Sequence, residues 1–323
     1  MFYRYSMKNF YTRIGYVGDL SEISGLLCND FNLGEFKSNK LVEVGYEDFN
    51  FILETTKGKY FIKIFSNFRT DEDCHRYVEI IKTALSKGIS TPKLYMSKQG
   101  YLHTITISKM KLRLVVMQFI DGETYFQLGE NPTFGEIKEL AKQAALINSI
   151  NIKPSFVYDS WAVTNILSEY EKKGEYLLPE DSKKIKSLMQ IYKDMKVESL
   201  PHSFVHGDLI STNVMKDKDG KIWLVDFSVS NYYPRIQELA VMACNILFDE
   251  KNKENSERNL KTALDEYQKQ IKLTPKELEV LPNYIKLAHA MHILGANYEK
   301  IVENNGSDEN RYWYNCGKVG LEL

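Results

Sequence analysis

The sequence predicts an α+β protein with two lobes, in which an antiparallel, β-rich N-terminal lobe precedes a mostly helical C-terminal lobe. The first part of this prediction rests on β-rich runs at residues 42–44, 49–53 and 60–65. The second part rests on apolar residues that recur with a helical period after residue 123. A chain of 323 residues is long enough to bury a substantial core in either one large unit or two lobes.

The N-terminal lobe is predicted to begin with a short helix that Asp19 can cap. The turn residues Lys57-Gly58-Lys59 separate the second and third β-rich runs, which predicts a hairpin. A second helix is expected to begin after Thr70 and to run to about Ser86, because Thr70 and Asp73 have the spacing of a capping box.

The boundary between the lobes is predicted at residues 118–123, with an N-terminal lobe at 1–117 and a C-terminal lobe at 124–323. An apolar strand leads there into an acidic turn that contains Gly122, as a hinge requires. Two helix starts in the C-terminal lobe are the capping box of Thr133 with Glu136 and the Thr274-Pro275 pair, with proline at the favoured first position.

The composition argues against nucleic acid or a membrane as a partner. The formal net charge is −1, and the basic residues form no stripe with interleaved aromatic platforms. No apolar run reaches the length of a membrane span, and the N-terminus lacks the apolar segment of a signal peptide. We therefore expect a soluble, cytoplasmic protein, and the sequence predicts no oligomeric state.

The cysteines and histidines indicate no metal site by their spacing. Four cysteines lie far apart without a C-x-x-C pair, which is typical of reduced thiols. His202, His289 and His292 have no ligand spacing that acids or thiols complete, so we expect core or surface roles for them.

Two short motifs contain the groups that phosphoryl transfer needs. Residues 205–214 contain an H-x-D-x-x-x-x-N pattern, in which the intervening residues let the chain turn back so that Asp and Asn face one cleft. Asp208 can accept a proton from an attacking hydroxyl, and His206 can brace the loop. Asn213 and Asp226 can hold Mg²⁺ against phosphates. Asp226 follows an apolar strand, so its carboxylate is expected to project from a rigid edge.

Each motif alone also fits an ordinary turn. Asp208 could cap a following helix while Gly207 relaxes the backbone, and an Asp at a strand end often starts a loop. The ordered pair, separated by the polar turn at 216–221, favours a kinase.

The H-G-D-L-x-x-x-N core with a following Asp-Phe resembles the aminoglycoside phosphotransferase and choline kinase superfamily. That resemblance implies a two-lobed, protein-kinase-like fold, ATP and Mg²⁺ as cofactors, and a small-molecule hydroxyl as the acceptor. Gly207 and Ser228 stand where protein kinases usually carry Arg and Gly, which favours the small-molecule branch. The G-Y-E-D-x-N-F pattern at 45–51 resembles the hydroxylysine-kinase-like and homoserine-kinase-like branches.

The resemblance also implies nucleotide-binding roles in the N-terminal lobe. Gly45 begins the loop expected to cover the ATP phosphates. Lys63 is expected on the α- and β-phosphates, although strand alternation alone also allows a lysine that faces water. The adenine is expected on the backbone around Gln118 and Ile120.

Two supporting carboxylates follow from the same comparison. A buried Lys63 needs an acidic partner, and helical periodicity leaves the choice open between Asp73 and Glu79. Family members commonly place an Asp where Glu238 stands, tying down the catalytic loop, and the longer Glu side chain leaves this role open.

The acceptor is expected to be of amino alcohol, amino acid or aminoglycoside type. Residues 311–314 could wall its pocket, and ordinary helix packing would explain them equally well. An amino acid would need a cation for its carboxylate, such as Arg235 or Arg311. Two alternative functions are a nucleotide-binding pseudokinase and an atypical protein kinase. The complete set of motif residues argues against the first, and the absence of an evident activation segment between Asp226 and Glu238 argues against the second.

Overall fold

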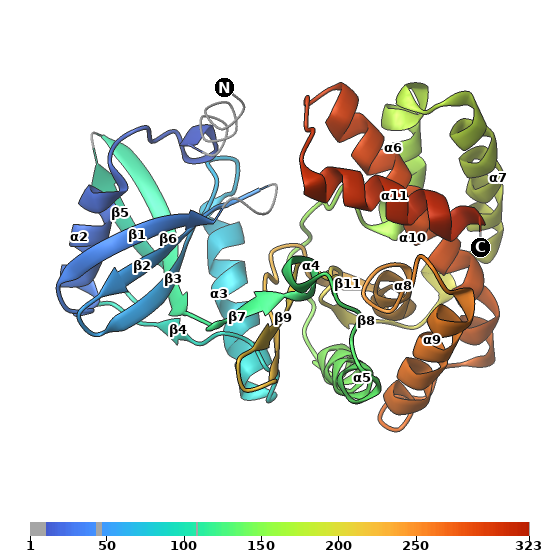
Figure 1. Ribbon diagram of the computed structural model, residues 1–323, viewed down its shortest axis with the longest axis horizontal. Coiled ribbons are helices and arrows are strands. Elements are labelled where there is room, and N and C mark those ends of the chain that lie inside the picture. The colour runs from blue at the N-terminus through green and yellow to red at the C-terminus, as the bar shows by residue number, and fades with distance from the viewer. Residues whose placement is uncertain (1–10, 43–46, 108, 323) are drawn as a thin grey trace. The chain divides into compact units, whose positions relative to one another are not determined.

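The chain divides into two compact units, Met1–Asp121 and Gly122–Leu323, each described here by itself (Figure 1). The computed structural model describes residues 11–42, 47–107 and 109–322. The division between the units falls inside the segment 118–123 that the sequence marks as a hinge. Among the described residues, no helix is both long and apolar enough to cross a membrane.

The first unit is built on an antiparallel sheet with the strand order β1-β2-β3-β6-β4, and β5 also pairs with β6. The strand β2 alternates strictly between buried and half-buried residues, so that one of its faces lies in the core. The helices and strands of this unit are α2 (Leu20–Asp30), β1 (Phe36–Val42), β2 (Phe49–Thr55), β3 (Gly58–Ile64), α3 (Asp71–Ser86), β4 (Leu94–Tyr95), β5 (His103–Ile107) and β6 (Met110–Gln118).

Three local expectations for this unit are confirmed. The side chain of Asp19 caps α2, Lys57 and Gly58 lie at the β2–β3 turn, and Thr70 with Asp73 forms the capping box of α3. The first strand is β1 at 36–42, which includes Val42 of the expected run at 42–44, while residues 43 and 44 lie outside the described residues. Four of the seven residues of β1 are polar and none of the seven is buried, as suits an edge strand, so an apolar pattern does not mark its full length.

The second unit is mainly helical and contains two small antiparallel sheets, β10-β9-β7 and β11-β8. Its strands are β7 (Gly122–Thr124), β8 (His202–Val205), β9 (Val214–Asp217), β10 (Ile222–Leu224) and β11 (Asn231–Pro234). Its α-helices are α4 (Tyr125–Leu128), α5 (Phe134–Asn148), α6 (Ile166–Lys173), α7 (Pro179–Met195), α8 (Ile236–Cys244), α9 (Lys253–Tyr267), α10 (Pro275–Ile301) and α11 (Asp308–Glu322), and short 3₁₀ turns occupy Val163–Asn165, Gly174–Tyr176 and Val197–Ser199.

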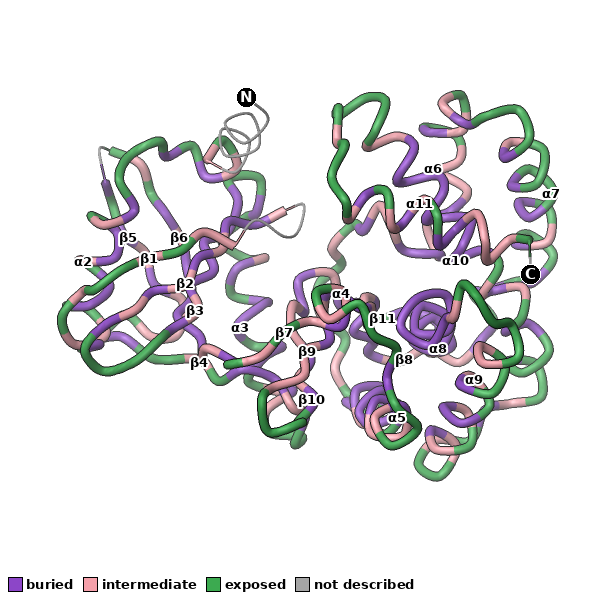
Figure 2. The backbone as a smooth tube through the Cα atoms, viewed as in Figure 1, coloured by how far each residue is buried: buried purple, intermediate pink, exposed green. Residues whose placement is uncertain are grey.

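Helix α8 lies at the centre of this unit, since all nine of its residues are buried (Figure 2). The capping box of Thr133 and the proline start after Thr274 are confirmed at α5 and α10. Gly122 lets β7 lie against β9, because a Cβ there would lie 2.3 Å from the Lys216 carbonyl oxygen. The loop between β8 and β9 therefore begins and ends on fixed strands, next to the buried α8.

Candidate active site

The loop from His206 to Asn213, called here the catalytic loop, joins β8 to β9 and is organised around a buried histidine. The His206 ring is fully buried, and its Nε2–H donates to the Val225 carbonyl at 3.1 Å. Its Nδ1 accepts from the Asp208 backbone N–H at 3.3 Å. These two bonds require the neutral tautomer with its proton on Nε2, and burial lowers the pKa of His206 to about 4. The ring is therefore a brace that links the catalytic loop to the segment after β10.

The carboxyl group of Glu238, on α8, accepts hydrogen bonds from the backbone of the same loop. Its Oε2 accepts from the backbone N–H of His206 at 2.7 Å and of Gly207 at 3.5 Å. Burial raises the pKa of Glu238 to about 8, against the effect of these two bonds. Gly207 has φ +85°, in the left-handed region that favours glycine. The contact between Glu238 and the catalytic loop, which the sequence left open for a Glu at this position, is therefore present.

Asp208 and Asn213 are joined directly, as the motif spacing predicts. The Asn213 Nδ2–H₂ donates to the Asp208 carboxylate at 2.6 Å and to the Asp208 carbonyl at 3.1 Å. These bonds fix which end of the amide faces Asp208, and the amide oxygen of Asn213 takes the opposite side. The side chains of the expected base and of one expected metal ligand therefore hold each other in place.

Asp226 is placed by the peptide that precedes it. The Val225 N–H donates to the Asn213 carbonyl at 2.9 Å, while the Val225 carbonyl accepts from His206. Asp226 itself has φ +64°, a conformation that Asp tolerates better than most residues. Its Oδ1 accepts from the Ser228 hydroxyl at 2.5 Å. The structure thus brings His206, Asn213 and Asp226 into one hydrogen-bonded frame.

Lys63, in β3, is buried and forms an ion pair with a residue that the sequence analysis did not consider for it. Its Nζ lies 3.0 Å from Oδ2 of Asp48, and the two side chains are 3% and 1% exposed. The other oxygen of Asp48 accepts from Arg69 Nε at 2.8 Å and from the Ser66 N–H at 3.1 Å. Burial alone would raise the pKa of Asp48, but the charges of Lys63 and Arg69 outweigh it and hold this pKa well below its usual range.

The two carboxylates proposed from the sequence are used elsewhere, so this expectation is wrong. Asp73 accepts from the backbone and hydroxyl of Thr70 in the capping box. Glu79 is exposed and pairs with Lys82 at 2.8 Å. The charge of Lys63 is therefore balanced from the loop before β2 instead of from α3.

The other three residues expected to bind the nucleotide are Gly45, Gln118 and Ile120. Gly45 lies outside the described residues. Gln118 ends β6, and its backbone N–H donates to the Lys93 carbonyl at 2.8 Å, so this N–H is already used within the unit. Ile120 is buried.

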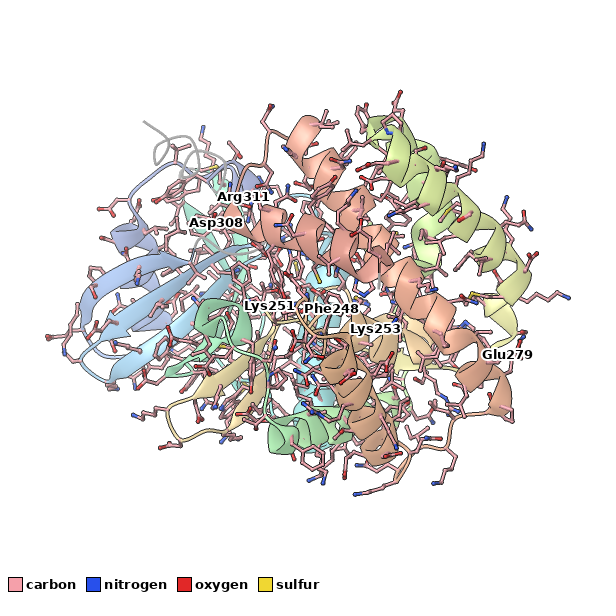
Figure 3. All side chains as sticks on the ribbon, turned by 45° about the vertical axis from the view of Figure 1, so that its right-hand side comes forward. Phe248, Lys251, Lys253, Glu279, Asp308 and Arg311 are labelled. Carbon is pink, nitrogen blue, oxygen red and sulfur yellow. The ribbon has the colours of Figure 1, made fainter. Side chains whose placement is uncertain are left out.

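Both arginines suggested for an acceptor carboxylate are paired with acids in this structure. Arg235 donates from Nε and Nη2 to the two carboxylate oxygens of Glu277, at 2.7 and 2.8 Å. Arg311 pairs with Asp308 at the exposed start of α11, where Figure 3 shows both side chains.

The aromatic residues that follow Arg311 serve mainly in helix packing. Trp313 is 3% exposed and packs on the ring of His292, at 5.3 Å between centroids. Tyr312 packs edge-on against Phe126, also at 5.3 Å. Of the two explanations for residues 311–314, packing accounts for the observed contacts.

Comparisons with known proteins agree on one family and one fold. A family model described as "Phosphotransferase enzyme family" matches residues 39–270. The homoserine kinase of Methylobacterium nodulans is 20% identical over 262 residues, covering 81% of this chain and 80% of that protein. The homoserine kinase of Bartonella henselae is 22% identical over 292 residues, covering 88% and 89%.

Solved structures similar to this chain include two small-molecule kinases. A microcompartment-associated aminopropanol kinase has a TM-score of 0.72 at 12% identity, covering 94% of this chain and 96% of that one. An amicoumacin kinase in complex with AMP-PNP and Ca²⁺ has a TM-score of 0.69 at 16% identity, covering 95% and 94%. At these identities the likeness shows the fold, which confirms the predicted kinase-like α+β architecture.

Proposed function

We propose, from the premise that this chain belongs to the phosphotransferase enzyme family, that it transfers the γ-phosphate of ATP to a hydroxyl group of a small amino alcohol or amino acid. Membership of the family makes the chain a phosphotransferase. The observation that carries the finer proposal is the frame around Val225, whose peptide N–H and carbonyl bond the Asn213 and His206 ends of the catalytic loop. This frame holds the groups that the motif assigns to the base and to the metal.

The donor atoms of the frame suit Mg²⁺. Mg²⁺ prefers oxygen ligands, and the Asn213 amide oxygen and the Asp226 carboxylate are of this kind. When bound, Mg²⁺ would neutralise charge on the phosphate oxygens. In this proposal Ser228 keeps Asp226 oriented through the bond to its Oδ1.

We assign Asp208 the role of accepting the proton of the acceptor hydroxyl. Its carboxylate is held by the Asn213 amide at 2.6 Å, and its backbone N–H is held by His206. Such positioning matters because most of the rate in phosphoryl transfer comes from alignment and charge stabilisation. His206 acts as a positioning residue, since its two ring nitrogens are already used and its lowered pKa keeps it neutral.

We assign Lys63 to the phosphates of ATP, with Asp48 holding its ammonium group in place. The buried carboxylate balances the charge of the lysine and holds its Nζ at 3.0 Å. The loop that begins at Gly45 is proposed to cover the phosphates with backbone N–H groups. For the adenine we propose the Gln118 carbonyl as acceptor and the Ile120 N–H as donor, because the Gln118 N–H is already bonded to Lys93.

The class of acceptor draws on two kinds of support. The curated relatives named above are homoserine kinases, and the 45–51 pattern resembles the same branch. The pairing of Arg235 with Glu277 removes one cation expected for an amino-acid carboxylate, which favours an amino alcohol such as ethanolamine or aminopropanol. A test panel must therefore contain both kinds of molecule.

The decisive experiment measures Mg²⁺-dependent release of ADP from ATP in the presence of single acceptors. The panel contains homoserine, hydroxylysine, choline, ethanolamine, aminopropanol, aminoglycosides and simple sugars. We expect one class to stimulate turnover, and Asp208→Ala to lower that turnover about 10²–10⁴-fold, the usual effect of losing a general base. ATP binding should survive in the variant.

Two other outcomes would replace the proposal. Tight ATP binding without stimulated turnover by any acceptor would point to a nucleotide-binding regulator. Phosphate transferred to a protein substrate, with the small molecules inert, would point to an atypical protein kinase.

A further inference from the structure

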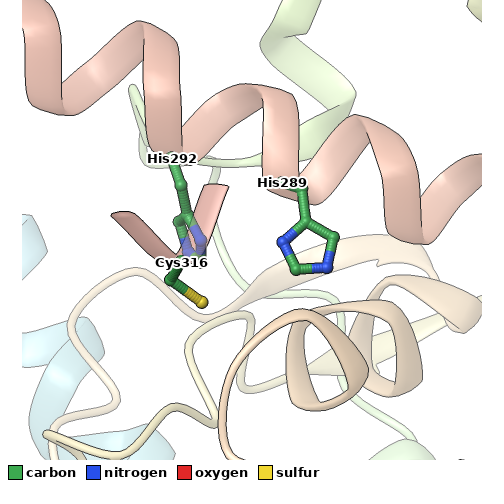
Figure 4. A group of neighbouring side chains, drawn as sticks. All are labelled: His289, His292 and Cys316. Carbon is green, nitrogen blue, oxygen red and sulfur yellow. The ribbon is translucent and has the colours of Figure 1, made fainter. Parts of the chain in front are cut away.

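A second cluster of chemically distinctive side chains lies among the C-terminal helices, apart from the motif residues. His289 and His292 project from α10 and Cys316 from α11, as Figure 4 shows. One ring nitrogen of each histidine and the sulfur of Cys316 all lie within 4.8 Å of one another. The three side chains are buried. The cluster joins residues 27 positions apart in the chain, which is why spacing in the sequence did not reveal it.

The sequences of α10 and α11 allow these three side chains to come together. Residues three apart on a helix share a face, so α10 presents both imidazoles to α11. Glycines on α11 allow the close approach: a Cβ at Gly317 would lie 2.7 Å from the His289 carbonyl oxygen. A Cβ at Gly320 would lie 2.1 Å from the His289 ring itself. A larger residue at either glycine would therefore push α11 away and separate Cys316 from the histidines.

One nitrogen of each imidazole in the cluster lacks the bond that a buried imidazole normally makes. Among the described residues, the Nδ1 atoms of both His289 and His292 have no hydrogen-bond partner. Leaving a buried polar nitrogen without a partner is unfavourable. The rings around the cluster offer no bond: Phe248 lies 4.7 Å from His289, and Trp313 packs on His292.

We propose that His289, His292 and Cys316 bind a single zinc ion that fastens α10 to α11. Two imidazole nitrogens and one thiolate are the donors that zinc prefers, and a fourth position is left for another ligand. On binding, the Cys316 thiol gives its proton to solvent and its sulfur coordinates as a thiolate, without any change in oxidation state. Ligand atoms of a tetrahedral zinc site lie about 3.5 Å apart, so atoms that now lie up to 4.8 Å apart must approach by up to about 1.3 Å.

The cluster also lies two contacts away from the catalytic loop. The Cys316 thiol donates to the Cys244 carbonyl at 3.1 Å, at the end of α8. The next residue, Asn245, accepts from the Ser211 N–H of the catalytic loop at 2.7 Å. Zinc binding removes the thiol proton and so replaces this hydrogen bond with a bond from Cys316 to the metal, which would change the contact between α11 and the end of α8.

The test uses the full chain, stripped with a chelator and then titrated with zinc or cobalt. We expect one zinc per chain by elemental analysis after gel filtration. Co²⁺ should give the near-ultraviolet band of a sulfur–cobalt bond, which oxygen ligands at Asn213 and Asp226 cannot produce. Cys316→Ser should lose the band and bind zinc at least tenfold more weakly. Cys74→Ser, which alters a cysteine equally buried in the first unit, should behave as the wild type.

A second variant and a measurement on the wild type keep the test decisive if the Cys316→Ser variant fails to fold. His292→Gln should also weaken zinc, and zinc should raise the melting temperature of the wild type but not of either cluster variant. If both variants fail to fold, the cobalt spectrum of the wild type decides alone, since a thiolate band supports the site. The proposal is refuted if the wild type binds neither ion or shows no thiolate band. It is equally refuted if Cys316→Ser keeps the affinity of the wild type. None of these readouts depends on kinase activity.

Discussion

Replacing Asp48 with Asn would leave two buried cations facing an uncharged amide. The amide oxygen of Asn can still accept from the Ser66 N–H, so the shape of the loop is kept and mainly the charge is lost. Arg69 keeps its second carboxylate, Glu47, so the uncompensated charge falls on Lys63, which is 3% exposed. Removing one partner of a buried ion pair costs about 3–5 kcal/mol. Because the Arg69–Glu47 pair remains, we expect the loss in unfolding free energy to lie near the lower end of this range.

The pH dependence of this loss gives a second, independent signature. Because the folded-state pKa of Asp48 is lowered, its stabilising contribution is complete above the unfolded-state pKa and disappears as the pH falls through the folded-state pKa. The difference in unfolding free energy between the wild type and Asp48→Asn should therefore be constant from about pH 8 to pH 5 and shrink below about pH 4.

The assay must report on the first unit alone. All three tryptophans, Trp161, Trp223 and Trp313, belong to the second unit, so their fluorescence does not follow the unfolding of this sheet. Amide hydrogen exchange of peptides from β2 and β3 measures the free energy directly. The matched control is Glu79→Gln, which removes an exposed acid whose pair with Lys82 is worth less than about 1 kcal/mol.

Enzyme kinetics extend the same test to the proposed function. With Lys63 less firmly held, we expect Asp48→Asn to raise the KM for ATP and lower kcat, while Glu79→Gln changes neither. The reasoning would be wrong if Asp48→Asn lay within 1 kcal/mol of the wild type in exchange, a bound below the cost expected for breaking a buried pair. It would also fail if Glu79→Gln had the larger effect.

Two further predictions concern the support of the catalytic loop. Glu238→Gln should keep the bonds to the loop backbone, whereas Glu238→Ala leaves two buried N–H groups without partners, at about 1–3 kcal/mol each. The folded-state pKa of Glu238 is raised to about 8, so its contribution to the free energy of unfolding is complete below about pH 4 and is lost as the pH rises towards 8. In urea titrations between these pH values, the stability of Glu238→Gln should therefore increase relative to that of the wild type. Gly207→Ala should cost about 1–2 kcal/mol through its backbone alone, since the nearest atom to a Cβ there is at the ordinary distance of 3.6 Å. The control is Gly220→Ala, because Gly220 has a similar φ of +82° in the β9–β10 turn. It should lose as much stability in tryptophan-monitored unfolding but leave kcat unchanged. Equal losses of kcat in the two glycine variants would argue against a role for the conformation of the catalytic loop.

The parts of the molecule that the sequence predicted well depend on residues close together in the chain. Capping boxes join residues three apart, and the catalytic loop places Asp208 and Asn213 five apart. At such separations the local backbone conformation decides which side chains meet, so the motif itself carries the geometry. Asp226 lies farther along, but the short β9–β10 hairpin returns it to Asn213 through the Val225 N–H.

Contacts between distant helices could not be predicted in the same way. The pairing of Arg235 with Glu277 depends on how α10 crosses the start of α8, and the cluster around Cys316 depends on glycines that matter only once α11 lies on α10. Neither arrangement leaves a periodic signal in the chain. A helix can be predicted from its own apolar stripe, but the stripe does not say which helix will cover it.

The partner of Lys63 belongs to neither case, because the information needed to find it was present in the sequence. The turn at Lys57-Gly58 fixes the register of β2 and β3, and this register places Asn50 directly opposite Lys63. A residue two positions before Asn50 lies on the same face of the hairpin, as a diagonal neighbour of Lys63. That residue is Asp48. Counting outward from the predicted turn would have chosen it over Asp73 and Glu79, because side-chain alternation in a paired strand restricts neighbours more tightly than the rotation of a helix whose packing is unknown. The acid in the G-Y-E-D pattern is therefore better explained as the counter-charge of Lys63 than as a group facing the phosphates.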